Sequence, residues 1–203
     1  MKILNLHGYH ASAENSACYA LKACGYEVIS PQIDYDNEFP RDLIAKLTEL
    51  YQSAHCEAVV GSSMGGFFAE TVSHLIKNCP AVLINPCITP HIFFAKAGVT
   101  DKRFLSEYLF YTHNFESAFI NPYEMTHAII GLKDDTLDTH DYIIAMLGKE
   151  NCELVPDGGH PGSTLPLEYI FRMHEKWFTE KPDCKLNDDI FNIDELRNNS
   201  KSC

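Results

Sequence analysis

The chain has 203 residues, of which 45% are hydrophobic and 22% charged, a composition typical of one globular domain with a full-sized core. Its net charge of −12 argues against nucleic acids or anionic membranes as partners, because no basic stripe offsets the repulsion of phosphate groups. No apolar run approaches the ~20 residues of a membrane-spanning helix, and the N-terminal apolar stretch is too short for a signal peptide. We therefore expect a cytoplasmic protein.

The eight cysteines show neither C-x-x-C spacing nor the rhythm of a metal-binding finger. Several lie inside apolar stretches, as Cys56 and Cys152 do at the starts of expected strands. Small buried hydrophobic side chains in a reducing compartment explain this pattern better than disulfides or zinc. The sequence therefore predicts no metal site.

Short apolar, β-branched runs alternate with helix-like segments along the chain, which is the pattern of βαβ units and a parallel sheet. In chain order, the expected strands are residues 3–6, 27–30, 58–60, 81–85, 128–132 and 153–155. The expected helices are residues 12–23, 41–53, 64–77, 140–148 and 167–178. Because the strands read as continuous apolar runs, we expect a three-layer α/β fold: about six mostly parallel strands, covered by helices on both faces.

Residues 87–127 break this rhythm, because they hold many aromatic side chains but no clear strand. An insertion of this length is more often a functional lid than a structureless loop. The alternative is a pair of extra helices that pack their aromatic side chains into the main core, and the two interpretations are compatible. We expect a small helical lid insertion within one domain, residues 1–180, followed by a polar C-terminal tail, residues 181–203.

The most informative motif is Gly61-Ser62-Ser63-Met64-Gly65-Gly66, a G-x-S-x-G pattern between an expected strand and an expected helix. A sharp strand-to-helix turn crowds the backbone around its central serine, so the flanking positions must lack side chains. The turn also leaves Ser63 at a helix N-terminus, where free N–H groups favour negative charge. The pattern predicts that Ser63, rather than Ser62, is a nucleophile.

A nucleophilic serine needs a histidine to take its proton, and the histidine needs an acid to fix its tautomer. His160 follows the Gly158-Gly159 turn after the last expected strand, where open α/β sheets place their sites. Among its competitors, His174 lies in the middle of an expected helix. His140 begins a helix, where we expect a solvated side chain. His160 is therefore the predicted base.

The acid follows the expected strand 128–132, in the run Asp134-Asp135-Thr136-Leu137-Asp138. Asp134 comes first after the strand end and is the predicted acid. Asp135 remains a competitor, and Asp138 also reads as the N-cap of the following helix. The chain order is then Ser, Asp, His, which is the order of the α/β-hydrolase arrangement.

Acyl transfer also needs backbone donors for an oxyanion, one after the nucleophile and one from an early loop. The N–H of Met64 fills the first position. The first strand ends in Leu6-His7-Gly8-Tyr9, and the N–H of Tyr9 is the predicted second donor. We interpret His7 as a structural residue that orders this loop, not as a base.

Together these segments resemble the small YqiA-like esterase family of the α/β-hydrolase superfamily. The matching pieces are Leu6-His7-Gly8-Tyr9, the serine motif, Asn85-Pro86 with Pro90, the Asp134–Asp138 run and Gly158-Gly159-His160. The likeness spans roughly residues 1–178. It implies an esterase, active on carboxylic esters or acyl thioesters, with no cofactor. Carried over residue by residue, it implies the same catalytic residues: Ser63, Asp134 and His160.

The leading hypothesis is a serine hydrolase acting on a small-molecule ester or thioester through an acyl-enzyme. The aromatic residues of the 87–127 stretch suggest an apolar acyl or aryl group. One alternative is a binding protein that keeps the fold without the chemistry, since fold alone does not fix function. A different reaction on the same fold is another. The oligomeric state is not encoded in any motif of the sequence.

Overall fold

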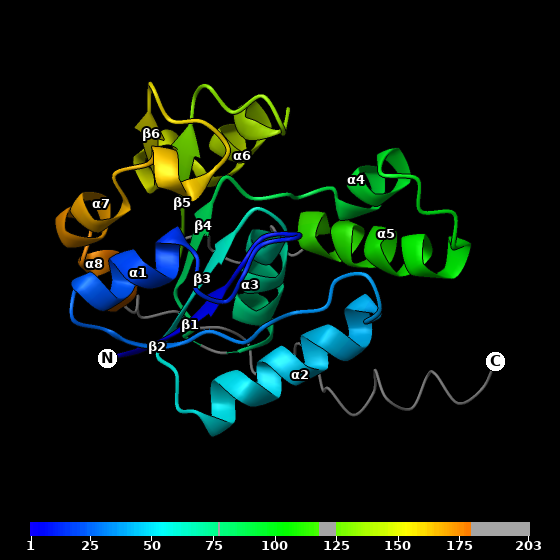
Figure 1. The fold of residues 1–203 in the computed structure, drawn as a ribbon, viewed down its shortest axis with the longest axis horizontal. Helices are drawn as coiled ribbons and strands as arrows, with labels where there is room; N and C mark the ends of the chain where they lie inside the picture. The colour runs from blue at the N-terminus through cyan, green and yellow to red at the C-terminus, as the bar shows by residue number, and fades with distance from the viewer. Residues whose placement is uncertain (77, 118–124, 180–203) are drawn as a thin grey trace.

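The computed structural model describes residues 1–76, 78–117 and 125–179, and its centre is one parallel six-stranded sheet (Figure 1). The strand order is β2-β1-β3-β4-β5-β6, and every neighbouring pair is parallel. The strands are β1 Lys2–Leu6, β2 Glu27–Ile29, β3 Ala58–Ser62, β4 Ala81–Ile84, β5 Thr126–Gly131 and β6 Cys152–Val155. All six expected strands are present, with ends shifted by at most two residues.

Helices cover both faces of the sheet, as expected. The α-helices are α1 Ser16–Ala23, α2 Pro40–Ser53, α3 Met64–Leu75, α4 Pro90–Lys96, α5 Lys102–Ser117, α6 His140–Leu147, α7 Leu167–Met173 and α8 Lys176–Thr179. The short 3-10 helices η3 Lys149–Asn151 and η4 Gly162–Thr164 follow α6 and β6. Of these helices, α1, α7 and α8 lie together on one side of the sheet, and α2 and α3 lie on the other (Figure 1).

Two expected helices differ in extent. The helix expected over residues 12–23 begins only at Ser16, because Asn15 caps it with a side-chain oxygen that accepts the N–H of Cys18 at 2.8 Å. The single helix expected over residues 167–178 is wrong: the structure divides it into α7 and α8. His174, at the C-terminal cap of α7, stacks on Trp177 with ring centroids 3.9 Å apart. It therefore does not lie in the middle of a helix.

Each strand contributes to two separate cores, because successive side chains of a strand point to opposite faces of the sheet. On β1, Leu4 and Leu6 join the core under α2 and α3, and Ile3 joins the core under α1 and α7. Val59 and Val60 on β3 divide in the same way, and all five side chains are fully buried. Burial on both faces accounts for the continuous apolar runs in the sequence.

The order of the strands fixes where a site can form. From β1 the chain moves outward to β2, then returns to the other side of β1 for β3. The loops that leave the carboxyl ends of β1 and β3 therefore diverge to opposite faces. Such a switch point opens a crevice at the sheet edge, where α/β proteins bind their ligands. Residues 7–9 and the serine motif are the loops that border it.

The aromatic stretch 87–127 forms α4 and α5, and its described side chains favour the core-packing interpretation. Phe94, Phe104 and Tyr108 are buried and contact one another through their rings, and Tyr108 also packs against Phe67 and Phe68 of α3. Phe110 is 53% exposed. The expectation of a lid falls partly on residues 118–124, and that of a polar tail on residues 181–203; both segments lie outside the described residues.

Two further expectations concern the state of the cysteines and membrane-spanning helices. The six cysteines within the described ranges are free thiols, and Cys18, Cys56, Cys79 and Cys87 are buried. Among helices in the described part of the chain, none is long and apolar enough to cross a membrane.

Candidate active site

The serine motif forms a tight turn between β3 and α3, and Ser63 adopts a strained backbone conformation there. Its φ is 52° and its ψ −119°, a combination that costs about 1–3 kcal/mol for a residue with a side chain. Close packing maintains this geometry. A side-chain carbon added to Gly65 would lie 2.2 Å from the carbonyl oxygen of Leu6, and one added to Gly61 would lie 2.1 Å from that of Gly65. Glycine is therefore the only residue that fits these two positions.

Ser63, His160 and Asp134 form a continuous chain of hydrogen-bond contacts. The Nδ1 of His160 lies 2.7 Å from Oδ2 of Asp134, and its Nε2 lies 3.0 Å from Oγ of Ser63. Because an ionised carboxylate can only accept, Nδ1 carries the ring proton and Nε2 accepts the serine hydroxyl hydrogen. The three residues come from the carboxyl ends of β3, β5 and β6, so the structure brings together the predicted nucleophile, acid and base.

Asp134 is held more firmly than its competitor Asp135. Its side chain is fully buried, and its Oδ1 accepts the N–H groups of Thr136 at 2.8 Å and Leu137 at 3.2 Å. Asp135 is exposed, and its side chain accepts a hydrogen bond from the hydroxyl of Thr136 at 3.5 Å. The position next to the strand end therefore directs Asp134, and not Asp135, toward His160.

The first turn of α3 and the loop after β1 both lie next to Ser63. Met64 is the first residue of α3, so its N–H has no acceptor within the helix. Gly8 packs against Ser63: a side-chain carbon on Gly8 would lie 3.1 Å from Cβ of Ser63 and 3.7 Å from its Oγ. Tyr9 follows directly. The loop after β1 thus passes close beside the hydroxyl, and a side chain at position 8 would intrude on it.

The side chain of His7 holds the loop after β1 in place through contacts with the backbone. Its ring is buried, its Nδ1 lies 2.7 Å from the carbonyl oxygen of Gly8, and its Nε2 accepts the N–H of Ile33 at 2.9 Å. Burial is the main effect on this ring and lowers its pKa, which favours the neutral form. A neutral ring with both nitrogens engaged in backbone contacts agrees with the structural role expected for His7.

Asn85 ties the strand ends together, a role that the sequence motif Asn85-Pro86 did not reveal. Its side chain is buried and spans three backbone groups. Nδ2 donates to the carbonyl oxygens of Gly159 at 2.9 Å and His160 at 3.1 Å, while Oδ1 accepts the N–H of Gly131 at 2.8 Å. Asn85 therefore fixes the loop that carries His160 to the ends of β4 and β5.

The expectation that His140 is solvated is wrong. Its side chain is only 13% exposed, and its Nε2 lies 3.2 Å from Oδ2 of Asp134, the same oxygen that His160 contacts. The loop between β5 and α6 folds back over the strand end, and this places the first residue of α6 beside the carboxylate. The sequence shows that a helix begins near His140, but not that the preceding loop folds back and buries this residue.

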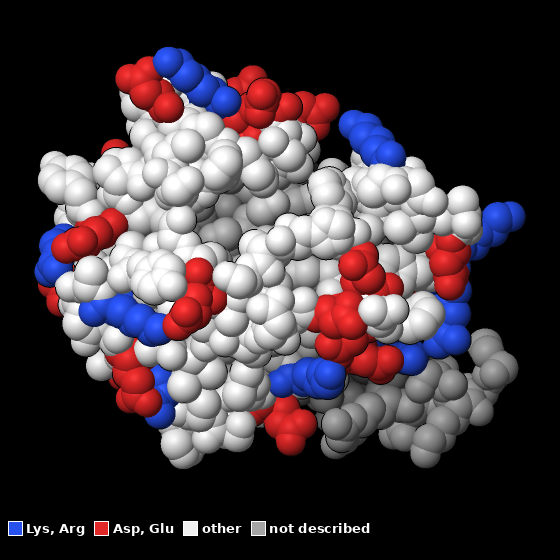
Figure 2. Space-filling view, in the orientation of Figure 1, with Lys and Arg blue, Asp and Glu red and all other residues white. Residues whose placement is uncertain are grey.

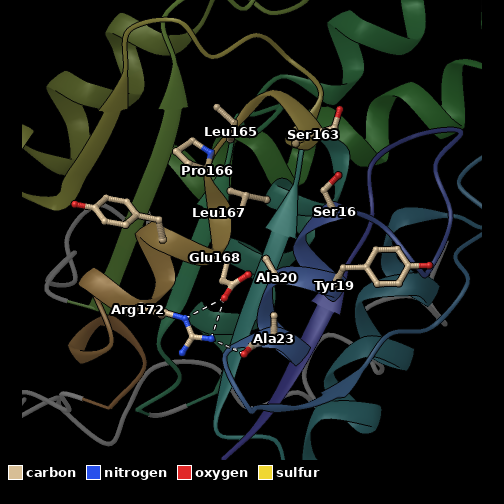
Figure 3. Close-up of a pocket in the computed structure, with 12 residues that line it drawn as sticks. Ser16, Tyr19, Ala20, Ala23, Ser163, Leu165, Pro166, Leu167, Glu168 and Arg172 are labelled. Carbon is tan, nitrogen blue, oxygen red and sulfur yellow. Dashed lines mark hydrogen bonds and ion pairs between the residues drawn. The ribbon is translucent and has the colours of Figure 1, made fainter.

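A cavity of about 700 Å³ lies between α1 and the η4–α7 segment (Figure 3). Tyr19 and Ala20 of α1 and Leu167 of α7 contribute to its largely apolar wall. Its charged pair is internally satisfied, since Arg172 bonds both Glu168 and the carbonyl oxygen of Ala23. None of its lining residues belongs to the Ser63 site.

Figure 2 shows a hollow near the centre of this face that is bordered mainly by uncharged atoms, while Lys, Arg, Asp and Glu side chains are spread over other parts of the face. Within the described ranges, no group of three or more His, Cys, Asp or Glu side chains is arranged to hold a metal ion.

Comparisons with known proteins support the fold and the family resemblance. Residues 2–98 match the model of an uncharacterised protein family, UPF0227, which is the YqiA-like family, so the resemblance is confirmed over that segment. No curated protein matches the chain. That matched segment includes the loop after β1, the serine motif and Asn85, but neither Asp134 nor His160.

Solved structures match nearly the whole chain and establish an α/β-hydrolase fold. Est1E from Butyrivibrio proteoclasticus aligns with a TM-score of 0.64 at 14% identity, over 88% of this chain and 88% of that chain. A structure reported with LipS and LipT, two metagenome-derived lipolytic enzymes, aligns with a TM-score of 0.64 at 14% identity, over 86% and 93%. An esterase from Pyrococcus furiosus aligns with a TM-score of 0.54 at 17% identity, over 87% and 80%.

The hydrogen bonds of the Asn85 side chain to the backbone of Gly131, Gly159 and His160 lead to a prediction about stability. In Asn85→Asp, a carboxylate oxygen replaces the amide that donates to two carbonyl groups, so we expect a loss of about 2–3 kcal/mol in the free energy of unfolding at pH 8. Protonation of the buried carboxyl restores a donor, and its pKa in the folded variant lies above the unfolded value. The deficit relative to the natural protein should therefore shrink at pH 5. Urea unfolding at pH 5 and pH 8 measures this difference in the free energy of unfolding. An equal deficit at both pH values would contradict the proposed donor role of the Asn85 amide.

Proposed function

We propose that the protein is a serine hydrolase that cleaves carboxylic esters or acyl thioesters through an acyl-enzyme on Ser63. The observation that carries the proposal is the hydrogen-bonded series Ser63–His160–Asp134 at a strained turn of an α/β-hydrolase fold. Neighbours of the same fold that are named esterases and lipolytic enzymes agree with this reaction class.

The proposed reaction begins when His160 Nε2 takes the proton of Ser63 as Oγ attacks the substrate carbonyl carbon. Asp134 holds the ring of His160 in the Nδ1–H tautomer and stabilises the imidazolium that forms. The N–H groups of Met64 and Tyr9 are the proposed donors to the oxyanion. His160 then protonates the leaving alcohol or thiol. Water, activated by the same ring, releases the acid and restores the Ser63 hydroxyl.

The substrate proposed is a small, uncharged ester or thioester with an apolar acyl or aryl group. Tyr9, which follows Gly8 in the chain, packs edge-on against Phe93 and Phe94 of α4, with ring centroids 5.4 Å and 5.2 Å away. The phenol of Tyr9 donates to Asp36 at 2.6 Å, and this hydrogen bond, as the main cause, raises the pKa of Tyr9 to about 12. The tyrosine therefore remains neutral and contributes an aromatic surface to this side of the crevice.

Labelling with a fluorophosphonate probe tests the nucleophile, because Ser62 provides a matched control one residue away. We expect the natural protein and Ser62→Ala to form a covalent adduct, and Ser63→Ala to form none while keeping its fold by circular dichroism. Intact-mass spectrometry counts the adducts. Labelling of Ser63→Ala, or no labelling of the folded natural protein, would exclude Ser63 as the nucleophile.

The two neighbouring aspartates separate the acid from its competitor. Asp134→Asn should favour the wrong tautomer of His160 and lower kcat for p-nitrophenyl butyrate by about 10³–10⁴-fold, with a much smaller change in KM. Asp135→Asn, at an exposed position, should stay within a few-fold of the natural enzyme. If Asp135→Asn loses the greater share of activity, the assignment of Asp134 is wrong.

A further inference from the structure

The carboxylate of Asp134 has two histidine neighbours on one oxygen. Oδ2 receives the Nδ1–H of His160 at 2.7 Å and lies 3.2 Å from Nε2 of His140, while Oδ1 is occupied by two backbone N–H groups. The second histidine arrives from α6, and the first from the loop after β6. The carboxylate is fully buried, so these donors replace the water that would otherwise solvate it.

The proton on His140 follows from this geometry. An unprotonated, electron-rich Nε2 would lie 3.2 Å from a negatively charged oxygen, so the favoured neutral tautomer carries its hydrogen on Nε2. Among the described residues, Nε2 of His140 meets no acceptor in full hydrogen-bond geometry, despite its 3.2 Å separation from Oδ2 of Asp134. The contact therefore acts as a close electrostatic approach, in which a ring N–H dipole competes with His160 for the same negative charge.

The charges around His140 favour its neutral form near pH 7. Burial is the largest effect and lowers its pKa; Asp134 and Asp141 oppose this, and His160 adds to it. Asp135 and Asp138 of the connecting loop are exposed and well screened.

Among the described elements, β5 and η3 pack most extensively against α6; η3 carries Lys149 and Glu150, and the titratable side chain of β5 is His127, near the amino end of that strand. Because η3 follows the C-terminal end of α6, its two charged side chains belong to the end opposite His140.

We propose that His140 is a positioning residue that acts through Asp134. Because both histidines contact Oδ2, His140 orients the carboxylate. It also lets His160 stay unprotonated, and so able to act as a base, down to a lower pH. The inference rests on the proposed function for its catalytic meaning. Both forms of His140 act in the same direction. The neutral ring withdraws part of the negative charge of Asp134 from His160, and the protonated ring repels an imidazolium there directly.

The test is a pair of substitutions at His140 with a matched control. His140→Phe keeps a ring but has no N–H, so it should move the acid limb of kcat/KM for p-nitrophenyl butyrate upward by about 0.5–1 pH unit. His140→Gln restores an N–H donor near the position of Nε2, so the acid limb of this variant should lie close to that of the natural protein. KM should stay within about two-fold in both, since His140 acts through Asp134. His174→Phe removes a histidine that pairs with Glu153 at 3.0 Å and should leave the limb in place.

A second readout separates this inference from the proposed function. NMR titration of the His160 ring proton on Cε1, assigned with His160→Gln, reports protonation whether or not the enzyme turns over an ester. We expect the midpoint to rise in His140→Phe and to return toward the natural value in His140→Gln. An unchanged midpoint in His140→Phe, or equal shifts in both variants, would overturn the role of His140. Absence of ester turnover by the natural protein would instead overturn the proposed function.

Discussion

The site depends on the close packing of the first turn of α3 against the ends of β1 and β3. The backbone at Gly65 approaches the carbonyl oxygen of Leu6 so closely that no side chain fits, and this contact holds Ser63 at its positive φ. The strain at Ser63 is about 1–3 kcal/mol, comparable to the full burial of a single large apolar side chain. Phe67 and Phe68, one turn further along α3, are both fully buried. Their packing anchors the strained turn, and the same contact brings the Gly8 loop beside the hydroxyl.

Asp134 imposes the second constraint, because a fully buried carboxylate is stable only when donors surround it. Two loop N–H groups occupy one oxygen and two histidines approach the other. This arrangement makes the β5–α6 loop and the His160 loop depend on each other, and Asn85 joins them to the sheet. The geometry of His160 is thus determined from two directions: at its ring by Asp134 and at its backbone by Asn85.

The local pattern was sufficient to predict the strands, most helices and the residues that meet at the sheet edge. Each strand is a short apolar run with clear boundaries, and Ser63, Asp134 and His160 each follow a strand end. Parallel strands place such positions at one edge, so their approach follows from topology alone. That these residues catalyse the hydrolysis of an ester remains our proposal.

What the sequence could not predict depends on contacts between distant segments. His140 reads as the exposed start of a helix, yet the return of the preceding loop buries it against Asp134. Asn85 reads as part of a turn, yet it bonds to residues more than 70 positions away. The aromatic side chains of α4 and α5 had two compatible interpretations, because aromatic content does not distinguish a core from a lid. Tyr108 packs on the ring of Phe67 of α3 and Phe94 packs on Tyr108, and these contacts favour the core for both side chains.

The central claim is that an acyl group passes through Ser63, and rapid-quench mass spectrometry tests it most directly. The folded protein is mixed with excess p-nitrophenyl butyrate, quenched in acid within the first turnover, and digested with a protease. The account predicts a transient butyryl group on the peptide that contains Ser63, formed no more slowly than kcat and absent when Ser63 is alanine. Ester turnover without any acylated Ser63, or with the acyl group on another residue, would contradict it.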